Sequence, residues 1–198
     1  MTLRIAVLLS GSGRTLANLL DQADRGLLDA KVALVISSSR KAYGLVRARE
    51  REIPTQVHRW KRGADAAAYS EGVFAACRGA QVDLVCLAGW LKLLRPIPPE
   101  FAGRVLNIHP ALLPAYGGKG FYGHHVHQAV LDAGEAVSGC TVHQVDDEYD
   151  HGPIVLQHEV PVEPGDDVDA LAARVFAAEC AAYPEAIRQV GARLLAGP

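Results

Sequence analysis

The sequence predicts a single α/β domain built on an open, mostly parallel twisted sheet, with helices on both faces and an antiparallel extension near the C-terminal part. In roughly the first hundred residues, short apolar runs alternate with segments whose apolar residues recur at helical spacing, which is typical of parallel strands joined by crossover helices. Further on, apolar residues alternate in the two-residue period of antiparallel strands. With 198 residues, the chain has the length of one domain.

The first unit of this alternation is a strand, a tight turn and a helix. Residues Leu3–Leu9 form a continuous apolar run, and Ser10–Gly13 is a turn rich in glycine. Leu16, Leu19 and Leu20 then follow at helical spacing. This order of elements predicts a Rossmann-like start to the sheet.

The same alternation continues as far as Ala88. Beyond that residue, prolines interrupt any long helix until another short apolar strand begins at Val105. The predicted strands are Lys31–Ser37, Thr55–Trp60, Val82–Ala88 and Val105–His109, and the predicted helices are Ala42–Glu52 and Asp65–Gly79.

The C-terminal part begins with a glycine-rich connection over residues 110–123, which predicts a mobile ligand-binding loop. Asp166 or Asp167 can cap a last helix, and Pro184 is expected to bend or interrupt that helix. The predicted elements are a helix at His124–Ala133, strands at Val137–Val145 and Ile154–Val160 around an acidic turn at Asp146–Pro153, and the last helix to about Val190.

Composition and charge exclude several classes of partner. Lys and Arg number 20 against 22 acidic residues, so we expect no nucleic-acid partner. No apolar run is long enough to span a bilayer and no signal peptide is evident, which predicts a cytoplasmic protein without a membrane partner. The cysteines are far apart and form no CxxC pair, so we expect buried reduced thiols at Cys77, Cys86, Cys140 and Cys180.

The glycine turn is a candidate anion site. In Ser10–Thr15 the glycines permit close backbone approach, and the following helix directs free N–H groups at the turn. A Walker A motif is excluded because no Gly-Lys-Ser/Thr follows, and a dinucleotide site is disfavoured because Leu16 replaces the third glycine. The pattern favours a phosphate on a small substrate, and a plain structural turn is the alternative.

Asn107, His109 and Asp150 are the candidate catalytic residues. Asn107 and His109 end a predicted strand and face the same side of the sheet at its carboxyl edge, where ligands bind in open α/β sheets. An Asn amide can hold a developing oxyanion and His can move protons near pH 7. Because no serine or cysteine stands in a GxSxG elbow, an amine on the substrate is the expected nucleophile. Taken singly, each residue is better explained by a structural role: Asn107 as a cap at the strand end, His109 as a buried histidine and Asp150 as an Asx-turn.

The segment Asn107–Pro114 resembles the Asn-x-His-Pro-Ser-Leu-Leu-Pro signature of the folate-dependent formyltransferases. The chain is most similar to the branch that formylates a phosphorylated glycinamide ribonucleotide, and the resemblance covers almost its whole length. The further matching segments, all in family order, are Ser10–Thr15, Leu87–Leu94, Ser138–His143 and Asp146–Pro153.

The resemblance implies a division of roles among these residues. It implies a catalytic trio of Asn107, His109 and Asp150. The implied contacts to 5'-phosphoribosylglycinamide are Gly13, Arg14, Thr15, Asn107 and Glu179, and those to the folate are Leu91, Lys92, Leu93, Leu94, His143 and Asp146. It also implies 10-formyltetrahydrofolate as the formyl donor, with no metal. Read without the family, His143 is a strand histidine and Glu179 a solvated helix charge.

Two segments depart from the family pattern. Ala66 stands where many relatives carry an Arg that helps bind substrate, and Lys61 or Arg62 can supply the missing charge. Residues 115–125 form a loop that is longer and richer in glycine and histidine than in some relatives. Metal binding there is disfavoured because the histidines lack a neighbouring carboxylate or cysteine; these are His124, His125 and His127.

The expected activity is formyl transfer from 10-formyltetrahydrofolate to the amine of 5'-phosphoribosylglycinamide in de novo purine biosynthesis, by direct attack of the amine. The alternatives are a formyltetrahydrofolate hydrolase, expected to carry an extra amino-terminal region, and a non-catalytic nucleotide-binding module. We expect residues 1–103 to form the phosphoribosyl-substrate half and residues 104–198 the catalytic and folate half. The partners are then small molecules, and the protein is a monomer or homodimer.

Overall fold

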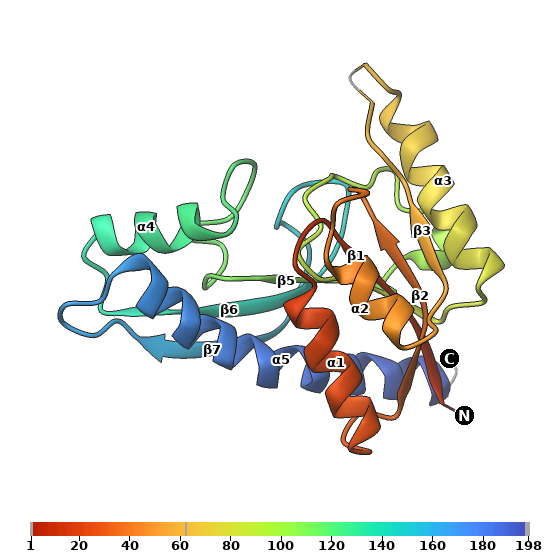
Figure 1. The fold of residues 1–198 in the computed structure, drawn as a ribbon. Helices are drawn as coiled ribbons and strands as arrows, with labels where there is room; N and C mark the ends of the chain where they lie inside the picture. Colours follow the sequence, from red (N-terminus) through yellow and green to blue (C-terminus); the bar gives the residue numbers. More distant parts are fainter. Residues whose placement is uncertain (1, 62, 197–198) are drawn as a thin grey trace.

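The computed structural model describes residues 2–61 and 63–196, which fold around one seven-stranded sheet (Figure 1). The strand order across the sheet is β3-β2-β1-β4-β5-β6-β7, with parallel pairing from β3 to β5 and antiparallel pairing from β5 to β7. The predicted sheet with its antiparallel extension is therefore confirmed. The strands are β1 (Leu3–Leu9), β2 (Ala30–Ser37), β3 (Thr55–Val57), β4 (Leu84–Leu87), β5 (Val105–His109), β6 (Val137–Gln144) and β7 (Ile154–Pro161).

Helices cover both faces of the sheet. One face packs against α1, α2, α4 and α5, and the other packs against α3 and the segment that follows β4. Because side chains alternate along a strand, Ile5, Val7 and Leu9 of β1 enter the first core and Ala6 and Leu8 enter the second. The helices are α1 (Arg14–Asp24), α2 (Gly44–Glu50), α3 (Ala66–Gly79), α4 (His124–Asp132) and α5 (Val168–Ala196), with a 3-10 turn at Pro99–Phe101.

The third strand is shorter than predicted. It ends at Val57 instead of Trp60, because the chain turns away after pairing with the end of β2. The backbone N–H of His58 still donates to the carbonyl of Ser37 at 2.9 Å, but the Trp60 ring packs edge-on against Tyr69 of α3, with the ring centroids 5.0 Å apart. A tertiary aromatic contact therefore overrides the local strand preference.

The last helix begins where a cap was predicted but is not interrupted. Asp167 accepts a hydrogen bond from the backbone N–H of Ala170 at 2.8 Å. Of the two predicted effects of Pro184, a bend or an interruption, the interruption is wrong, since α5 continues through Pro184 to Ala196; the bend stays a prediction. Proline lacks the N–H that would bind the Cys180 carbonyl four residues earlier. The Asn18 amide of α1 donates to that carbonyl at 2.9 Å and so replaces the missing bond.

All four cysteines are free, as predicted; Cys77, Cys86 and Cys140 are buried and Cys180 is half-buried. Across the described residues, none of the helices combines the length and the apolar character that a membrane crossing requires.

Candidate active site

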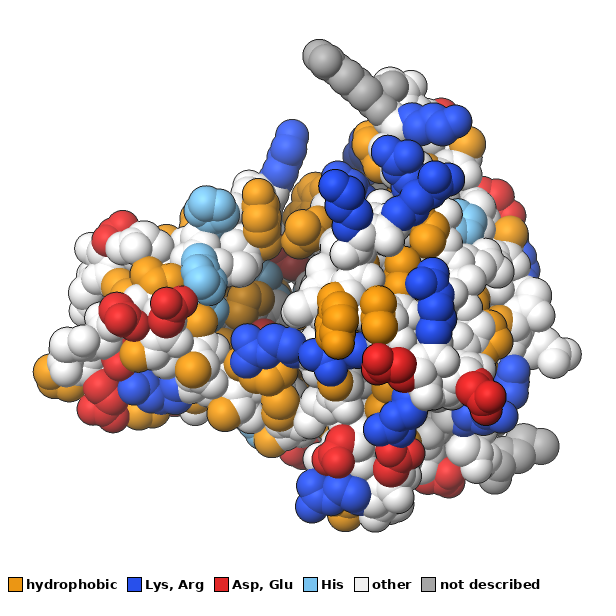
Figure 2. Space-filling model, in the orientation of Figure 1, with side chains coloured by type: hydrophobic (Ala, Val, Ile, Leu, Met, Phe, Trp, Pro, Cys, Tyr) orange, Lys and Arg blue, Asp and Glu red, His pale blue; other side chains and the backbone are white. Residues whose placement is uncertain are grey.

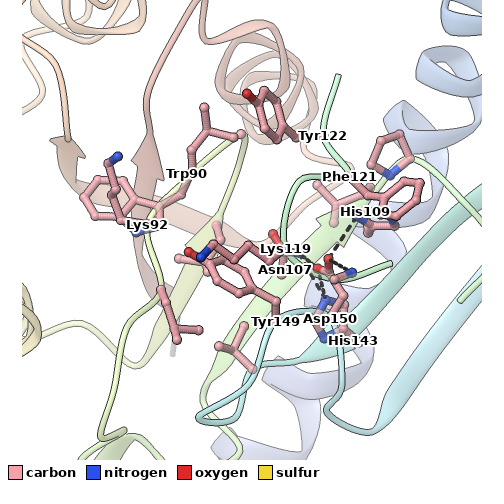
Figure 3. Close-up of a pocket in the computed structure, with 18 of the residues that line it drawn as sticks. Trp90, Lys92, Asn107, His109, Lys119, Phe121, Tyr122, His143, Tyr149 and Asp150 are labelled. Carbon is pink, nitrogen blue, oxygen red and sulfur yellow. Dashed lines mark hydrogen bonds and ion pairs between the residues drawn. The ribbon is translucent and has the colours of Figure 1, made fainter. Parts of the chain in front are cut away.

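A cavity of about 450 Å³ opens at the carboxyl ends of β4 and β5 (Figure 3). Its floor is formed by residues at the end of β5, and its walls come from the segment after β4, the glycine-rich loop before α4, and the turn between β6 and β7. We call this cavity the reaction pocket. It lies at the edge of the sheet where the sequence placed the ligand. Residues from both predicted halves of the chain line it, and the division into halves stays a prediction.

The predicted catalytic trio converges in the reaction pocket. The Asn107 amide nitrogen lies 3.3 Å from the Asp150 carboxylate, to which it donates a hydrogen bond. His109 Nδ1 lies 3.6 Å from the other carboxylate oxygen of Asp150. His143 joins this cluster from β6, with its Nε2 3.1 Å from the Asn107 amide nitrogen and 3.5 Å from Asp150. Figure 3 shows the four side chains directed toward one another.

The hydrogen bonds assign a tautomer to each histidine. His143 Nδ1 lies 2.9 Å from the Gln144 carbonyl, so Nδ1 carries the proton and Nε2 accepts from Asn107. His109 Nε2 lies 2.8 Å from the Tyr116 carbonyl and must donate to it. In neutral His109, the lone pair of Nδ1 then faces the Asp150 carboxylate.

The surroundings favour the neutral form of His109 and the ionised form of Asp150. Burial lowers the pKa of His109, and the nearby Asp150 carboxylate only partly opposes it. Burial by itself would raise the pKa of Asp150, but contacts with His143 and His109 and the Gly118 N–H, which donates at 2.9 Å, hold that pKa below its ordinary value. For His109, whose charge state the sequence left open, burial therefore favours the neutral form.

The backbone around Asp150 holds its carboxylate in place. Asp150 has φ of 53°, in the left-handed region that few residues other than glycine adopt. A Cβ at Gly152 would lie 2.0 Å from the Gln144 carbonyl oxygen, so only glycine fits between this turn and the end of β6. The glycine and proline that the sequence placed after Asp150 thus fix the turn against the sheet.

The glycine turn has the form of an anion site. Gly13 has φ of 71°, and a Cβ there would lie 2.6 Å from Gly44 Cα. The turn passes directly into α1, whose N-terminus has no side-chain cap and therefore leaves backbone N–H groups free for a ligand. Thr15, in the first turn of α1, lines the reaction pocket. Arg14 is exposed, and its guanidinium lies 3.8 Å from the centre of the Phe176 ring.

Glu179 lies on the wall of the same pocket. It comes from α5, and burial raises the pKa of its carboxyl group to about 7, against the opposing charge of Arg14. Among the described residues, no side chain forms an ion pair with it. A carboxylate that is half-buried without a partner is placed to accept hydrogen bonds from a ligand.

The predicted folate residues divide between two places. All of Leu91–Leu94 line the reaction pocket, and so does His143 within the catalytic cluster. Asp146 lies in an adjoining hollow beside Asp147, where its carboxylate is 2.7 Å from His151 Nδ1. Asp146 is thus not among the residues that line the reaction pocket, although the two hollows share Val145 and Glu148.

Several lining residues had no signal of their own in the sequence. Trp90 directly precedes the predicted folate stretch, and its buried Nε1–H has no partner in the described part of the chain. Lys119 and Tyr122 come from the glycine-rich loop, and Tyr149 comes from the acidic turn. Their position inside the family-matching segments or the glycine-rich loop was the only available signal for these residues.

Of the two departures from the family pattern, the first lies outside the catalytic cluster, whereas the second, residues 115–125, contributes the Tyr116 carbonyl and the Gly118 N–H to it. Ala66 is the first residue of α3, and Lys61 lines a separate hollow near the end of β3. Arg62 lies outside the described residues. His124 and His125 are exposed at the start of α4, whereas His127 is buried. Within residues 2–61 and 63–196, no cluster of three metal-ligating side chains is found.

Comparison with known proteins shows the family of the chain. A family model described as formyl transferase matches residues 3–187. The chain is 40% identical to the phosphoribosylglycinamide formyltransferase of Haemophilus influenzae, over 93% of this chain and 85% of that protein. It is 42% identical to the trifunctional purine biosynthetic protein adenosine-3 of Drosophila melanogaster, but spans only 14% of that protein.

Solved structures give the same result. Glycinamide ribonucleotide transformylase 1 from Symbiobacterium toebii matches with a TM-score of 0.85 and 41% identity, over 94% of this chain and 86% of that one. The phosphoribosylglycinamide formyltransferase from Brucella melitensis matches with a TM-score of 0.82 and 38% identity, over 96% and 95%. By its sequence and its fold, the chain belongs to the formyl transferase family and, within it, to the phosphoribosylglycinamide formyltransferases.

Proposed function

We propose that this protein transfers a formyl group from 10-formyltetrahydrofolate to the amine of 5'-phosphoribosylglycinamide, giving the N-formyl ribonucleotide of de novo purine biosynthesis. The observation that carries the proposal is the convergence of Asn107, His109 and Asp150 in a pocket whose lining residues include neither Ser nor Cys. An acyl-transfer site without a protein nucleophile is suited to an acceptor that brings its own amine.

The two substrates enter the reaction pocket from different sides. The phosphate of the acceptor binds the free N–H groups around Gly13, Arg14 and Thr15, and Glu179 accepts hydrogen bonds from the ribose or the amine. The pteridine of the donor packs against Leu91–Leu94, where the lining is mostly apolar. Holding both reactants in one cavity removes the entropy cost of their encounter, so both bind before chemistry.

The reaction proceeds by direct attack of the acceptor amine on the formyl carbon. A new C–N bond forms, and the carbonyl oxygen of the adduct becomes negative. The Asn107 amide donates to this oxygen in place of one of its present partners, His143 or Asp150. The developing charge raises the pKa of His109 from its lowered value, so that His109 takes up one proton from solvent. The imidazolium, paired with Asp150, stabilises the adduct and returns this proton to solvent when the adduct collapses.

Asp150 handles the proton. Its carboxylate, directly or through water, accepts a proton from the attacking nitrogen and returns it to N10 of the folate as the C–N10 bond breaks. The proton count balances, since one proton leaves the acceptor amine and one reaches the folate nitrogen. The proposed steps require neither a metal ion nor a covalent enzyme intermediate. The cytoplasmic location and the monomeric or homodimeric state stay predictions.

An absorbance assay tests the proposed function. Purified protein is mixed with glycinamide ribonucleotide and 10-formyltetrahydrofolate, and deformylated folate is followed with and without the ribonucleotide. We expect release of deformylated folate that depends on the ribonucleotide. Release that is independent of the ribonucleotide indicates the hydrolase instead, and ribonucleotide binding without any folate turnover indicates a non-catalytic module.

A further inference from the structure

Two carbonyl groups of the glycine turn are held by α2, a helix that contributes nothing to the lining of the reaction pocket. The Gly11 carbonyl accepts a hydrogen bond from the backbone N–H of Gly44, the first residue of α2, at 3.2 Å. The Ser12 carbonyl accepts a hydrogen bond from Nε of Arg47, one turn further along α2, at 3.1 Å. The start of α2 therefore fixes the orientation of two consecutive peptide units in the turn.

This orientation decides where the N–H groups of the turn point. In a trans peptide unit the N–H is directed opposite to the carbonyl. The N–H groups of Ser12 and Gly13 therefore face away from α2, and no backbone carbonyl among the described residues accepts from either. The first N–H groups of α1 follow directly and have no side-chain cap. Consecutive N–H groups that are free on one side of a turn form a concavity suited to an anion.

The peptide unit between Ser12 and Gly13 depends on Arg47 for its orientation. Gly13 has no Cβ, and glycine tolerates the backbone angles of both orientations, so this unit can turn over at little cost. A unit that has turned over directs the Ser12 carbonyl at the ligand in place of the Gly13 N–H, and the negative end of that carbonyl repels a phosphate. The hydrogen bond from Arg47 Nε opposes this rotation.

The Arg47 side chain is itself held beside the turn. Its guanidinium lies 5.0 Å from the centre of the Tyr43 ring, four residues earlier and on the same face of α2. Among the described residues, no acidic side chain forms an ion pair with Arg47, although Arg51 just beyond this helix is paired with Asp24. Figure 2 shows this face of the molecule, where Lys and Arg side chains lie beside hydrophobic ones over α1 and α2. Arg47 is therefore not drawn away from the Ser12 carbonyl by a carboxylate.

We propose that Arg47 is a positioning residue for the acceptor phosphate. Its Nε–H holds the Ser12 carbonyl away from the ligand, so that the Gly13 N–H donates to the phosphate. This inference rests on the proposed function, which places the phosphate of 5'-phosphoribosylglycinamide at the glycine turn. Because Arg47 acts through the turn and does not line the reaction pocket, its loss weakens binding of the phosphate and leaves the chemical step unchanged.

Steady-state kinetics of two variants separate the hydrogen bond of Arg47 from its charge. In Arg47→Met a methyl group takes the place of Nε, so that both the donor and the charge are lost. In Arg47→Gln the side-chain amide nitrogen takes that place, so that a donor is kept without the charge. We expect the KM for the ribonucleotide to rise about tenfold in Arg47→Met, as for the loss of one hydrogen bond to a charged group, and about threefold or less in Arg47→Gln. The value of kcat should stay within about twofold in both variants.

An acceptor without the phosphate, glycinamide riboside, shows whether Arg47 acts through the phosphate. We expect kcat/KM for the riboside to agree within about twofold between the unmodified protein and Arg47→Met, because neither can gain from the phosphate contact. The matched control is Arg49→Met, which removes an exposed arginine from the same helix. It is expected to leave the KM for the ribonucleotide unchanged.

Three results overturn the inference. The first is a KM for the ribonucleotide that is unchanged in Arg47→Met. The second is an equal rise in Arg47→Met and Arg47→Gln, which assigns the effect to the charge alone. The third is an equal loss of kcat/KM with the ribonucleotide and the riboside, which shows that Arg47 supports only the fold.

Calorimetric titration with the ribonucleotide separates this inference from the proposed function, since it requires no turnover. Binding without turnover in the unmodified protein overturns the proposed activity alone. In that case a Kd about tenfold higher in Arg47→Met than in the unmodified protein still supports the role of Arg47, and an equal Kd overturns it.

Discussion

At the scale of single residues, the proposed proton transfer depends on the negative charge of Asp150. An Asp150→Asn variant keeps an oxygen that can accept from the Gly118 N–H, but it cannot take a proton from the amine. We expect kcat to fall by a factor of about 10² to 10⁴, the usual contribution of general acid–base catalysis. The KM for the ribonucleotide and the thermal unfolding curve should change little. Turnover within fivefold of the unmodified protein, in a folded variant, would contradict the proposed role.

His127 gives a second prediction at this scale, one that concerns stability. Its side chain is 5% exposed, its Nδ1 has no partner in the described residues, and burial lowers its pKa to about 4. Because the unfolded chain titrates near pH 6.5, it binds more protons than the folded chain between pH 6.5 and 4. Above pH 6.5, His127 is neutral in both the folded and the unfolded chain and does not reduce the free energy of unfolding. As the pH falls from 6.5 towards 4, the free energy of unfolding decreases.

The corresponding variant is His127→Phe, which fills the same space without titrating. Urea unfolding at pH 7.5 and pH 4.5 should show that the unmodified protein loses about 2–3 kcal/mol more than the variant between these two pH values. The carboxyl groups titrate in both proteins, so their contribution to the change in unfolding free energy cancels when the two losses are subtracted. An equal loss in both would show that His127 does not titrate in this window.

At the scale of elements, α5 depends on a bond supplied by another helix. Asn18 of α1 donates to the Cys180 carbonyl that Pro184 leaves without its N–H. We expect Asn18→Ala to lower the free energy of unfolding by about 1–2 kcal/mol, because a carbonyl is left without a donor. In a Pro184→Ala protein, the N–H of Ala at position 184 can donate to the Cys180 carbonyl. Asn18→Ala should then lower the free energy of unfolding by less than it does in the unmodified protein. A double-mutant cycle by urea unfolding measures the difference, and strictly additive costs would contradict this account.

At this scale, the sequence predicts elements that depend on neighbouring residues and misses features that depend on contacts between residues far apart in the chain. The apolar runs of β1, β2 and β4 and the Asn107–His109 strand end depend on local pattern, and all were predicted within a few residues. The early end of β3 depends on a contact between Trp60 and Tyr69, and the continuity of α5 depends on Asn18. Such contacts join residues far apart in the sequence, so no local pattern reports them.

The candidate site shows the same division. Asn107 pairs with His143 near the end of β6, and Asp150 lies in the connection from β6 to β7, which brings the trio together. The resemblance to the family implied this trio, and no local pattern did. The Tyr116 carbonyl that holds His109 Nε2 was not predictable, because backbone atoms leave no trace in residue types. The position of Asp146 in the adjoining hollow also depends on which way the turn is directed, which its sequence does not specify.

At the scale of the whole molecule, Tyr183 joins the last helix to the centre of the sheet. Its side chain is fully buried, and its hydroxyl lies 2.9 Å from the Leu87 carbonyl of β4 and 3.0 Å from the Leu106 carbonyl of β5. These carbonyls belong to neighbouring strands, and Leu106 directly precedes Asn107. The contact thus ties the helix that carries Glu179 to the strand that carries the proposed oxyanion donor.

Tyr183→Phe tests this coupling, because it removes the hydroxyl and keeps the ring. We expect the free energy of unfolding to fall by about 1–3 kcal/mol, because the buried carbonyls of Leu87 and Leu106 lose the hydroxyl donor that they share. We also expect kcat to fall several-fold, since relaxation at Leu106 moves Asn107 by a fraction of an ångström. Tyr116→Phe is the matched control: it removes an exposed hydroxyl that donates to Glu135, and its stability should change by less than about 0.5 kcal/mol. If Tyr183→Phe loses stability while kcat is unchanged, the tyrosine supports the fold without positioning the site.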